Sequence, residues 1–157
     1  MKLYLAASYT RKPLILEYAK ALQAEGFETT SRWLTEPEHP ETWLEELTPE
    51  QLDQYAFRDL EDIEKADIFL LFTEALPDET KRAGRHVEFG YALAHMKSVI
   101  VIGPRINIFH YLYGVHQYDT LEKWIKADKE CQIREVELGK IFKALPLKEG
   151  ERTTPAS

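Results

Sequence analysis

The sequence predicts an α/β fold: a five-stranded parallel sheet, flavodoxin-like (Rossmann-like) in its strand order, with helices on both faces. Short apolar runs alternate along the chain with longer segments in which apolar residues recur at helical spacing. This alternation is typical of parallel strands joined by helical crossovers. Right-handed crossovers favour the strand order 2-1-3-4-5 and place ligands beyond the carboxyl ends of the strands.

The first half of the chain contains two predicted strands and two predicted helices. Pro13 suits a first helical position, and Gly26 suits the end of that helix. Thr48 and Gln51 have the spacing of a capping box, which marks the start of the second helix. The predicted elements are the strands Leu3–Ala7 and Phe27–Trp33, the helices Leu14–Glu25 and Thr48–Lys65, and a loop or lid at Leu34–Leu47.

The second half begins with five consecutive apolar residues, Ile68–Phe72, which predict a buried central strand. A polar loop follows, and then an amphipathic helix with Glu88 in its opening turn. The later predicted elements are the strands Val99–Gly103 and Val115–Tyr118 and the helices Thr120–Trp124 and Ile133–Leu145. We expect one domain over residues 1–145 and a loose polar tail over residues 146–157.

Composition and charge indicate a globular cytoplasmic protein. The chain has 157 residues, of which 44% are hydrophobic, and a net charge of −7, which disfavours nucleic acid as a partner. No apolar run is long enough for a membrane span or a signal peptide. The single cysteine, Cys131, excludes an internal disulfide and suits a reducing cytosol. Five scattered histidines form no ligand cluster, so no metal is expected.

Glu88 is the first candidate catalytic residue, because it follows a buried strand and a polar loop at a helix start. The free N–H groups and the partial positive charge of a helix start favour an ionised carboxylate. An ionised, positioned carboxylate is the nucleophile that sugar-transferring enzymes use. The alternative is that Glu88 only stabilises the helix start.

Asp59 is the second candidate, because it lies on or beside the apolar face of the predicted helix Thr48–Lys65. Burial raises the pKa of a carboxyl group, which makes it a proton donor. Two carboxyl groups in different environments are the usual arrangement for glycosyl chemistry. The alternative is that Asp59 forms a structural ion pair with Arg58 or Arg32.

The other candidate residues lie near the same crevice. Tyr4, inside the first strand, can orient a nearby carboxylate or belong to the core. Gly84 permits close approach of a ligand or is a plain loop glycine, and Asn107 can cap a turn. Four aromatic residues can stack on a flat ring or pack in the core: Tyr9, Trp33, Phe109 and Tyr111.

Four short segments together carry a family resemblance. Tyr4-Leu-Ala-Ala-Ser8 is similar to a first-strand pattern Tyr-Phe-x-x-Gly, and Arg58-Asp59-Leu60-Glu-Asp-Ile63 to a helix pattern Asn-Asp-Leu-x-x-Ile. Gly84-Arg-His-Val-Glu88-Phe-Gly90-Tyr91-Ala92-Leu93 matches Gly-x-x-x-Glu-(Leu/Ile)-Gly-Tyr-Ala-Leu, and Ile106-Asn107-Ile108 matches Ile-Asn-Leu/Met. In order and approximate spacing, Lys2–Tyr118 thus resembles the nucleoside 2-deoxyribosyltransferase family.

The resemblance implies a role for each matching residue. Glu88 would be the nucleophile that attacks the anomeric carbon, Tyr4 would orient it, and Asp59 would handle the proton of the base. Asn107 would reach into a neighbouring subunit's site, so the resemblance implies a homo-oligomer with shared active sites. It also implies nucleosides and free nucleobases as substrates and no cofactor. The residues expected to bind substrate are Ser8, Tyr9, Arg82, Gly84 and Asn107.

Two features depart from the family pattern. The family has an aspartate six residues before the nucleophile, where this chain has Arg82. It also uses a C-terminal carboxylate from a neighbour, whereas this sequence ends in Thr-Thr-Pro-Ala-Ser. Both features concern the grip on the nucleobase.

The expected function is a nucleoside (2′-deoxy)ribosyltransferase that exchanges nucleobases through a covalent glycosyl–Glu88 intermediate with retention. One alternative is a 2′-deoxynucleoside 5′-monophosphate N-glycosidase that binds phosphate through Ser8 and Arg11. The other is a nucleotide-sensing module without turnover.

Overall fold

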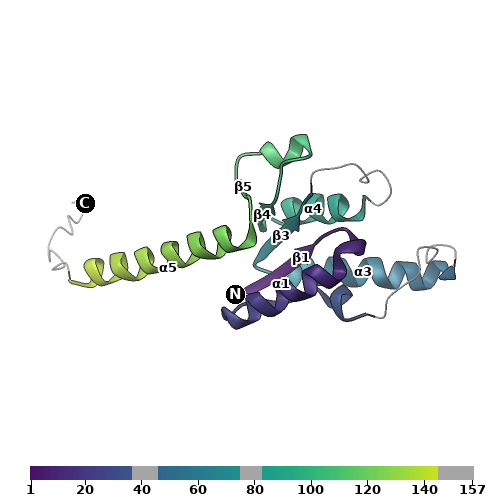
Figure 1. Ribbon diagram of the computed structural model, residues 1–157, viewed down its shortest axis with the longest axis horizontal. Helices are drawn as coiled ribbons and strands as arrows, with labels where there is room; N and C mark the ends of the chain where they lie inside the picture. The colour runs from purple at the N-terminus through teal and green to yellow at the C-terminus, as the bar shows by residue number, and fades with distance from the viewer. Residues whose placement is uncertain (37–45, 75–82, 145–157) are drawn as a thin grey trace, which may run out of the picture. The chain divides into compact units, whose positions relative to one another are not determined.

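The chain, described by a computed structural model over residues 1–36, 46–74 and 83–144, contains a five-stranded parallel sheet. The strand order β2-β1-β3-β4-β5 confirms the predicted flavodoxin-like order. The elements, drawn in Figure 1, are β1 (Lys2–Ala6), η1 (Tyr9–Arg11), α1 (Lys12–Ala24), β2 (Glu28–Thr29), η2 (Arg32–Thr35), α3 (Pro49–Lys65), β3 (Ile68–Phe72), α4 (Gly84–Ala94), β4 (Ser98–Ile102), η4 (Ile108–Tyr111), β5 (Val115–Tyr118) and α5 (Leu121–Ala144).

The chain divides into two units, Met1–Leu121 and Glu122–Ser157. The first unit holds the whole sheet, and the second begins within α5. The predicted tail over residues 146–157 lies outside the described residues, so the predicted domain boundary stays a prediction. In the described ranges, no helix combines the length and the apolar character that crossing a membrane requires.

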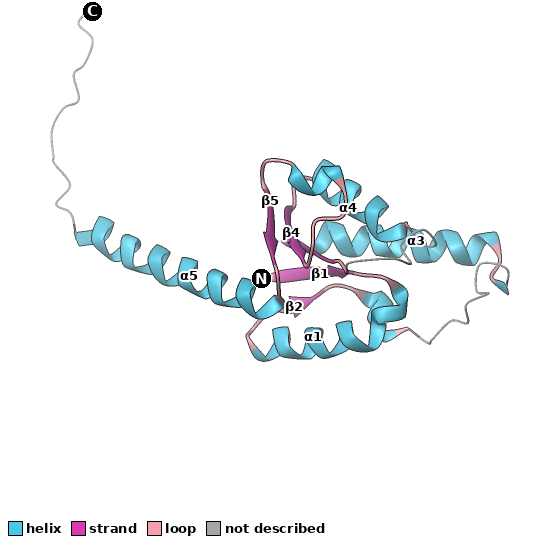
Figure 2. Ribbon diagram, turned by 45° about the horizontal axis from the view of Figure 1, so that its top comes forward, coloured by secondary structure: helices cyan, strands magenta, loops and turns pink. Residues whose placement is uncertain are grey.

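The centre of the sheet is apolar, because β3 is buried throughout and β1 is buried from Leu3 onward. Helix α1 lies on one face of the sheet and helices α3 and α4 on the other (Figure 2), as right-handed crossovers require for this strand order. Ala6 lies opposite Leu71, and Leu71 lies opposite Val101. The loops that follow β1, β3 and β4 therefore begin at one edge of the sheet.

The helix signals read from the sequence are confirmed at two ends. The Thr48 hydroxyl accepts a hydrogen bond from the Gln51 amide at 3.3 Å, and the Gln51 side chain accepts one from the Thr48 amide at 2.9 Å. This reciprocal box satisfies two of the free amides that begin α3. Gly26 follows α1 with a φ of +88°, the conformation in which a glycine ends a helix.

The predicted strand Phe27–Trp33 is too long, because only Glu28–Thr29 is a strand and Arg32–Thr35 forms the 3-10 helix η2. At Ser31 and Trp33, side chains rather than backbone groups of this segment form the hydrogen bonds to β1. The Ser31 hydroxyl accepts a hydrogen bond from the Leu5 amide at 2.7 Å, and the Trp33 indole donates one to the Leu5 carbonyl at 2.9 Å. The Leu5 amide and carbonyl are thereby satisfied by side chains at a position that β2 does not reach.

The two helices predicted at the end of the chain, Thr120–Trp124 and Ile133–Leu145, are one continuous helix, α5. Residues 125–132 contain no glycine and no proline, so nothing in the stretch between them breaks helical hydrogen bonding. Most of the predicted loop Leu34–Leu47 lies outside the described residues.

Gly103, directly after β4, permits the close approach of β3 and β4 at the carboxyl edge. Its φ is +113°, and a Cβ atom placed there would lie 2.5 Å from the Thr73 carbonyl oxygen and 2.7 Å from the Thr73 hydroxyl. Thr73 is itself held by a hydrogen bond from its hydroxyl to the Pro104 carbonyl at 2.7 Å. A side chain at position 103 therefore requires both backbone strain and a shift of this edge.

We predict that Gly103→Ala lowers the free energy of unfolding by about 2 kcal/mol or more, because it combines a positive φ with a backbone clash. The matched control is Gly90→Ala in α4, where a Cβ atom meets nothing within 4 Å. Alanine is the better helix former, so the control should be neutral or stabilising by up to about 1 kcal/mol. Urea denaturation of both variants measures the difference, and equal stabilities would contradict the argument.

Candidate active site

A hydrogen bond joins the centre of the sheet to helix α4. Tyr4 is fully buried in the middle of β1, and its ring stacks on Phe69 with centroids 5.6 Å apart. Its hydroxyl donates to Glu88 Oε1 at 2.8 Å. The structure thus brings together two candidate residues that are 84 positions apart in the sequence.

Glu88 lies in the second turn of α4, so the predicted position in the opening turn is wrong. The helix begins at Gly84, with Ala83 as its N-cap, and its first turn contains no acidic residue. The effect of a helix start on a charge fades after the first turn, so the predicted mechanism for keeping Glu88 ionised does not apply.

Burial governs the protonation of Glu88. The pKa of its carboxyl group is raised from 4.5 to about 7, chiefly by removal of the group from solvent and then by the negative charge of Asp59, whereas the hydrogen bond from Tyr4 lowers it. The side chain as a whole remains partly accessible. The sequence prediction of an ionised Glu88 is therefore corrected: near neutral pH, the free protein has this carboxyl partly protonated.

Asp59 projects from α3 and has a side chain that is 24% exposed. Burial raises the pKa of its carboxyl group, which is the predicted direction, whereas the charge and hydrogen bond of Arg58 lower it. The ion pair considered as the alternative is also present, because Arg58 Nη2 lies 3.2 Å from Asp59 Oδ1. Asp59 is close enough to both Tyr4 and Glu88 to raise the pKa of each.

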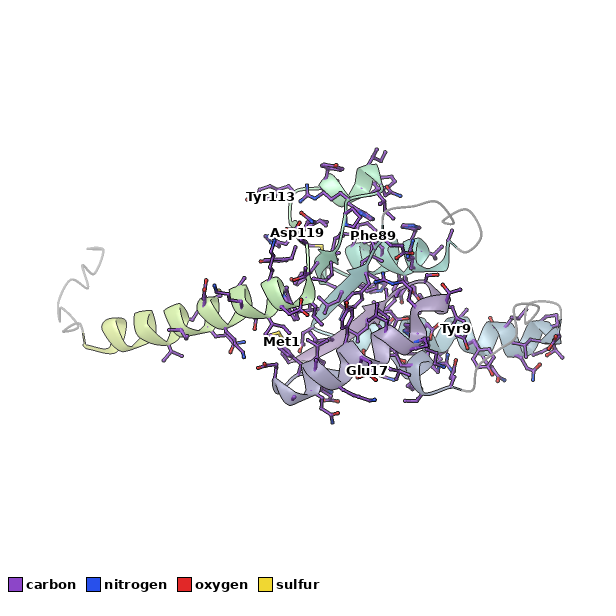
Figure 3. All side chains as sticks on the ribbon, viewed as in Figure 1. Met1, Tyr9, Glu17, Phe89, Tyr113 and Asp119 are labelled. Atoms are coloured by element: carbon purple, nitrogen blue, oxygen red, sulfur yellow. The ribbon has the colours of Figure 1, made fainter. Side chains whose placement is uncertain are left out.

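The residues predicted in the loop after β1 lie at the carboxyl edge. Ser8 is the N-cap of η1, and its hydroxyl lies 3.0 Å from the Thr10 hydroxyl. The ring of Tyr9, labelled in Figure 3, lies 6.3 Å from the ring of Trp33 and 5.5 Å from the ammonium nitrogen of Lys12. Ser8 and Tyr9 therefore lie just beyond the carboxyl end of β1, where the topology predicts a ligand site.

The remaining predicted residues have different outcomes. Gly84 is the first residue of α4 rather than a loop glycine, and the space where a Cβ atom would lie is open. Asn107 caps η4, because its side chain accepts a hydrogen bond from the Phe109 amide at 2.9 Å. Arg82 lies outside the described residues.

An ion cluster that the sequence analysis did not foresee lies beside this edge. Glu74, two residues after β3, accepts hydrogen bonds from Arg11 at 2.7 Å and from the buried Arg85 at 2.9 Å. Arg11 had been considered only as a phosphate ligand. An acidic residue directly beyond a buried strand was the available signal, since such positions meet at the carboxyl edge.

His110 was also missed, and it is fully buried. Its ring lies 5.0 Å from Phe89 and 6.0 Å from His86, and neither ring nitrogen has a hydrogen-bond partner among the described residues. Its pKa is lowered to about 4, chiefly by burial and then by the charges of His86, Arg85 and Arg105. The imidazole is therefore neutral near neutral pH. No three His, Cys, Asp or Glu side chains gather as a metal site in the described ranges.

Comparison with known proteins supports the fold. No protein-family model and no curated protein matches the sequence. Among solved structures, the 2-deoxyribosyltransferase from Bacillus psychrosaccharolyticus matches with a TM-score of 0.62 and 20% identity over 80% of this chain and 90% of that chain. The chain has the fold of a 2-deoxyribosyltransferase. The predicted resemblance is thus confirmed at the level of the fold.

A second solved structure is also similar. The CMP N-glycosidase BcmB of Clostridium botulinum matches with a TM-score of 0.49 and 19% identity, over 82% of this chain and 98% of that chain.

The raised pKa of Glu88 predicts a cost in stability that depends on pH. A carboxyl group whose pKa is raised on folding destabilises the folded state as the pH rises from 4.5 through about 7, and the full cost is present above that range. The rise corresponds to about 3 kcal/mol. We therefore predict that Glu88→Gln, which can still accept the Tyr4 hydrogen bond, increases the free energy of unfolding by up to about 3 kcal/mol at pH 8.

Urea denaturation across about pH 5 to 8 tests this prediction, since the gain should shrink toward the acidic end. The control is Glu17→Gln on the exposed surface of α1 (Figure 3), which should change stability by less than about 0.5 kcal/mol throughout. A gain for Glu88→Gln that is constant with pH would show that ionisation is not its cause.

Proposed function

We propose that the protein is a nucleoside (2′-deoxy)ribosyltransferase that exchanges nucleobases through a covalent glycosyl–Glu88 intermediate. The observation that carries this proposal is the 2.8 Å hydrogen bond from Tyr4 to Glu88, with Asp59 close enough to change the pKa of Glu88. This arrangement fits the roles that the sequence resemblance implies, and it occurs in a chain with a 2-deoxyribosyltransferase fold.

The first half-reaction uses both carboxyl groups. The ionised oxygen of Glu88 attacks the anomeric carbon through an oxocarbenium-like transition state and forms a glycosyl ester. The bond from this carbon to the base nitrogen breaks, and its electron pair leaves with the base. Asp59 donates a proton to the base, which makes it a better leaving group.

The second half-reaction reverses these steps with a different base. A nitrogen of the incoming base attacks the anomeric carbon, the ester bond breaks, and Glu88 is released as a carboxylate. The proton lost by the incoming base returns to Asp59. Two displacements at the same carbon give net retention.

Tyr4 has two effects on the nucleophile. Its hydrogen bond to Oε1 favours the ionised form of Glu88 against burial, and it leaves Oε2 as the oxygen that can attack. The pKa of Tyr4 itself is raised well above its usual value, chiefly by burial and then by the charge of Glu88, so the phenol remains a donor.

A second candidate, the 2′-deoxynucleoside 5′-monophosphate N-glycosidase, is favoured by the ion cluster. Two guanidinium groups, those of Arg11 and Arg85, gather at Glu74 beside the carboxyl edge. Guanidinium groups bind phosphate through paired hydrogen bonds, so this cluster suits a substrate phosphate. In this candidate, water replaces the second base.

One assay separates the candidates. The protein is incubated with a deoxynucleoside, with and without a second free base, and with the corresponding 5′-monophosphate, and the products are chromatographed. Base exchange supports the transferase, base release from the monophosphate alone supports the glycosidase, and no turnover of any of these substrates supports the sensing module.

We predict that Glu88→Ala folds but loses base exchange by at least about a thousandfold, because a covalent nucleophile is removed. The control is Val87→Ala, one residue earlier in α4, whose side chain is 68% exposed and should be dispensable. Initial rates of exchange measure both variants. Near-normal exchange by folded Glu88→Ala would disprove the covalent role.

We also propose a homo-oligomer with shared sites. The segment around η4 exposes several apolar side chains close together in the sequence, and the most exposed of them, Tyr113, projects away from the ribbon in Figure 3. The exposed residues are Ile108, Phe109, Tyr111, Leu112 and Tyr113. Such a cluster supports a subunit contact, and the resemblance gives Asn107, at the start of the segment, a role in the partner's site.

Complementation tests this assembly. We predict that Glu88→Ala and Asn107→Ala are each inactive, and that mixing them after dissociation restores activity. In a dimer the recovery should reach about a quarter of wild-type activity, since half of randomly mixed dimers are hybrid and one site in each is intact. A monomer by sedimentation, or no recovery despite confirmed subunit mixing, would contradict the shared site.

A further inference from the structure

Arg58, which directly precedes Asp59 in α3, is held from three sides. Its Nη2 lies 3.2 Å from Asp59 Oδ1, its Nη1 contacts Glu36 Oε1, and its guanidinium carbon lies 4.9 Å from the ring centroid of Tyr55. The side chain is only 18% exposed. A half-buried cation between two carboxylates, with an aromatic face beside it, has a defined position rather than a loose surface one.

Several charged groups surround Asp59, and Arg58 is the cation with the largest effect on it. Helix α3 also contributes Asp62, which raises the pKa of Asp59, and η2 contributes Arg32, which lowers it less than Arg58 does. Among the residues that the structure describes, this neighbourhood also contains Tyr4 of β1, Glu88 of α4 and Glu36, which follows η2.

Arg32 is occupied elsewhere. Its Nε lies 2.7 Å from Asp62 and its Nη2 lies 3.0 Å from Glu61. Arg58 is therefore the cation that bonds Asp59 directly and does most to stabilise its charged form, and Arg32 adds a smaller effect.

We propose that Arg58 is a positioning residue that keeps Asp59 charged in the free protein and thereby leaves the proton of the carboxyl pair on Glu88. The geometry that carries the proposal is the fixed place of Arg58, which bonds Asp59 at 3.2 Å and contacts Glu36 on its other side. Asp59 in turn acts on Glu88 through its charge. The charge of Asp59 raises the pKa of Glu88. The inference rests on the proposed function only for its meaning in catalysis.

As a consequence, the proton of the carboxyl pair stays on Glu88, which in this form cannot act as a nucleophile, until a base binds. The reaction needs an ionised Glu88 and a protonated Asp59, which is the opposite distribution of the same proton. A base nitrogen that accepts a hydrogen bond from Asp59 favours the protonated form of Asp59, so base binding shifts the proton away from Glu88. The sequence pattern resembled by residues 58–63 has an uncharged asparagine where this chain has Arg58.

The test is a titration of the two carboxyl groups by carbon-13 NMR of the free protein. The signals are assigned by their loss in Glu88→Gln and Asp59→Asn. In Arg58→Gln, we expect the midpoint of Asp59 to rise and that of Glu88 to fall, because a protonated Asp59 no longer repels a charge on Glu88. Arg58→Lys keeps the positive charge and should restore both midpoints toward their wild-type values.

Glu36→Gln provides a variant of opposite sign. This variant removes the carboxylate that competes for Arg58, so that Arg58 interacts with Asp59 alone of the two. The titration midpoint of Asp59 should therefore fall, and that of Glu88 should rise. The control is Lys65→Gln at the end of α3, which removes an exposed cation that lies 3.8 Å from Glu61 and should move neither midpoint.

Unchanged midpoints in folded Arg58→Gln, or a shift of both in the same direction, would overturn the inference. If Arg58→Gln does not fold, Glu36→Gln decides, and absence of its opposite shifts would overturn the inference as well. The titration needs no substrate. A protein with these shifts but no base exchange would refute the proposed function alone, whereas base exchange without the shifts would refute this inference alone.

Discussion

The desolvation of the Glu88 carboxyl group is the constraint around which the polar groups of this fold are arranged. A carboxyl group at the junction of a central strand and a helix loses much of its hydration, and one strong donor, the Tyr4 hydroxyl, partly replaces it. Tyr4 can do so because its ring is fixed by complete burial and by stacking on Phe69. The sheet therefore fixes the position of the Tyr4 hydroxyl that donates this hydrogen bond.

The position of Glu88 depends in turn on how α4 begins. Arg85, in the first turn of that helix, is buried and pairs with Glu74, which also binds Arg11 from the loop after β1. The Arg85 side chain is removed from water, and a buried charge needs partners in good geometry. This cluster therefore ties α4 to the ends of β1 and β3, and it fixes the register in which Glu88 meets Tyr4.

The two carboxyl groups are alike in chemistry and different in surroundings. Burial raises the pKa of both, but Asp59 has a cation bonded to it, whereas Glu88 has a neutral phenol and a neighbouring negative charge. The unequal partners decide which group holds the proton. A fold that keeps a buried carboxyl group partly neutral loses stability at high pH, and under the proposed function this is the cost of holding a nucleophile at that position.

The sequence by itself determined the sheet, because β3 is a run of five apolar residues and such runs alternate with capped helices. The sequence also indicated Tyr4, Asp59 and Glu88 as residues of one site. Only the tertiary structure decided three other features. The second strand ends early because Ser31 and Trp33 bond to Leu5 of another strand. Helix α4 begins at Gly84, and Arg85 in its first turn pairs with Glu74 of the loop after β3. The protonation of Glu88 depends on residues of β1 and α3 that surround it in the folded protein. A local sequence pattern carries no information about which distant groups will surround a side chain after folding.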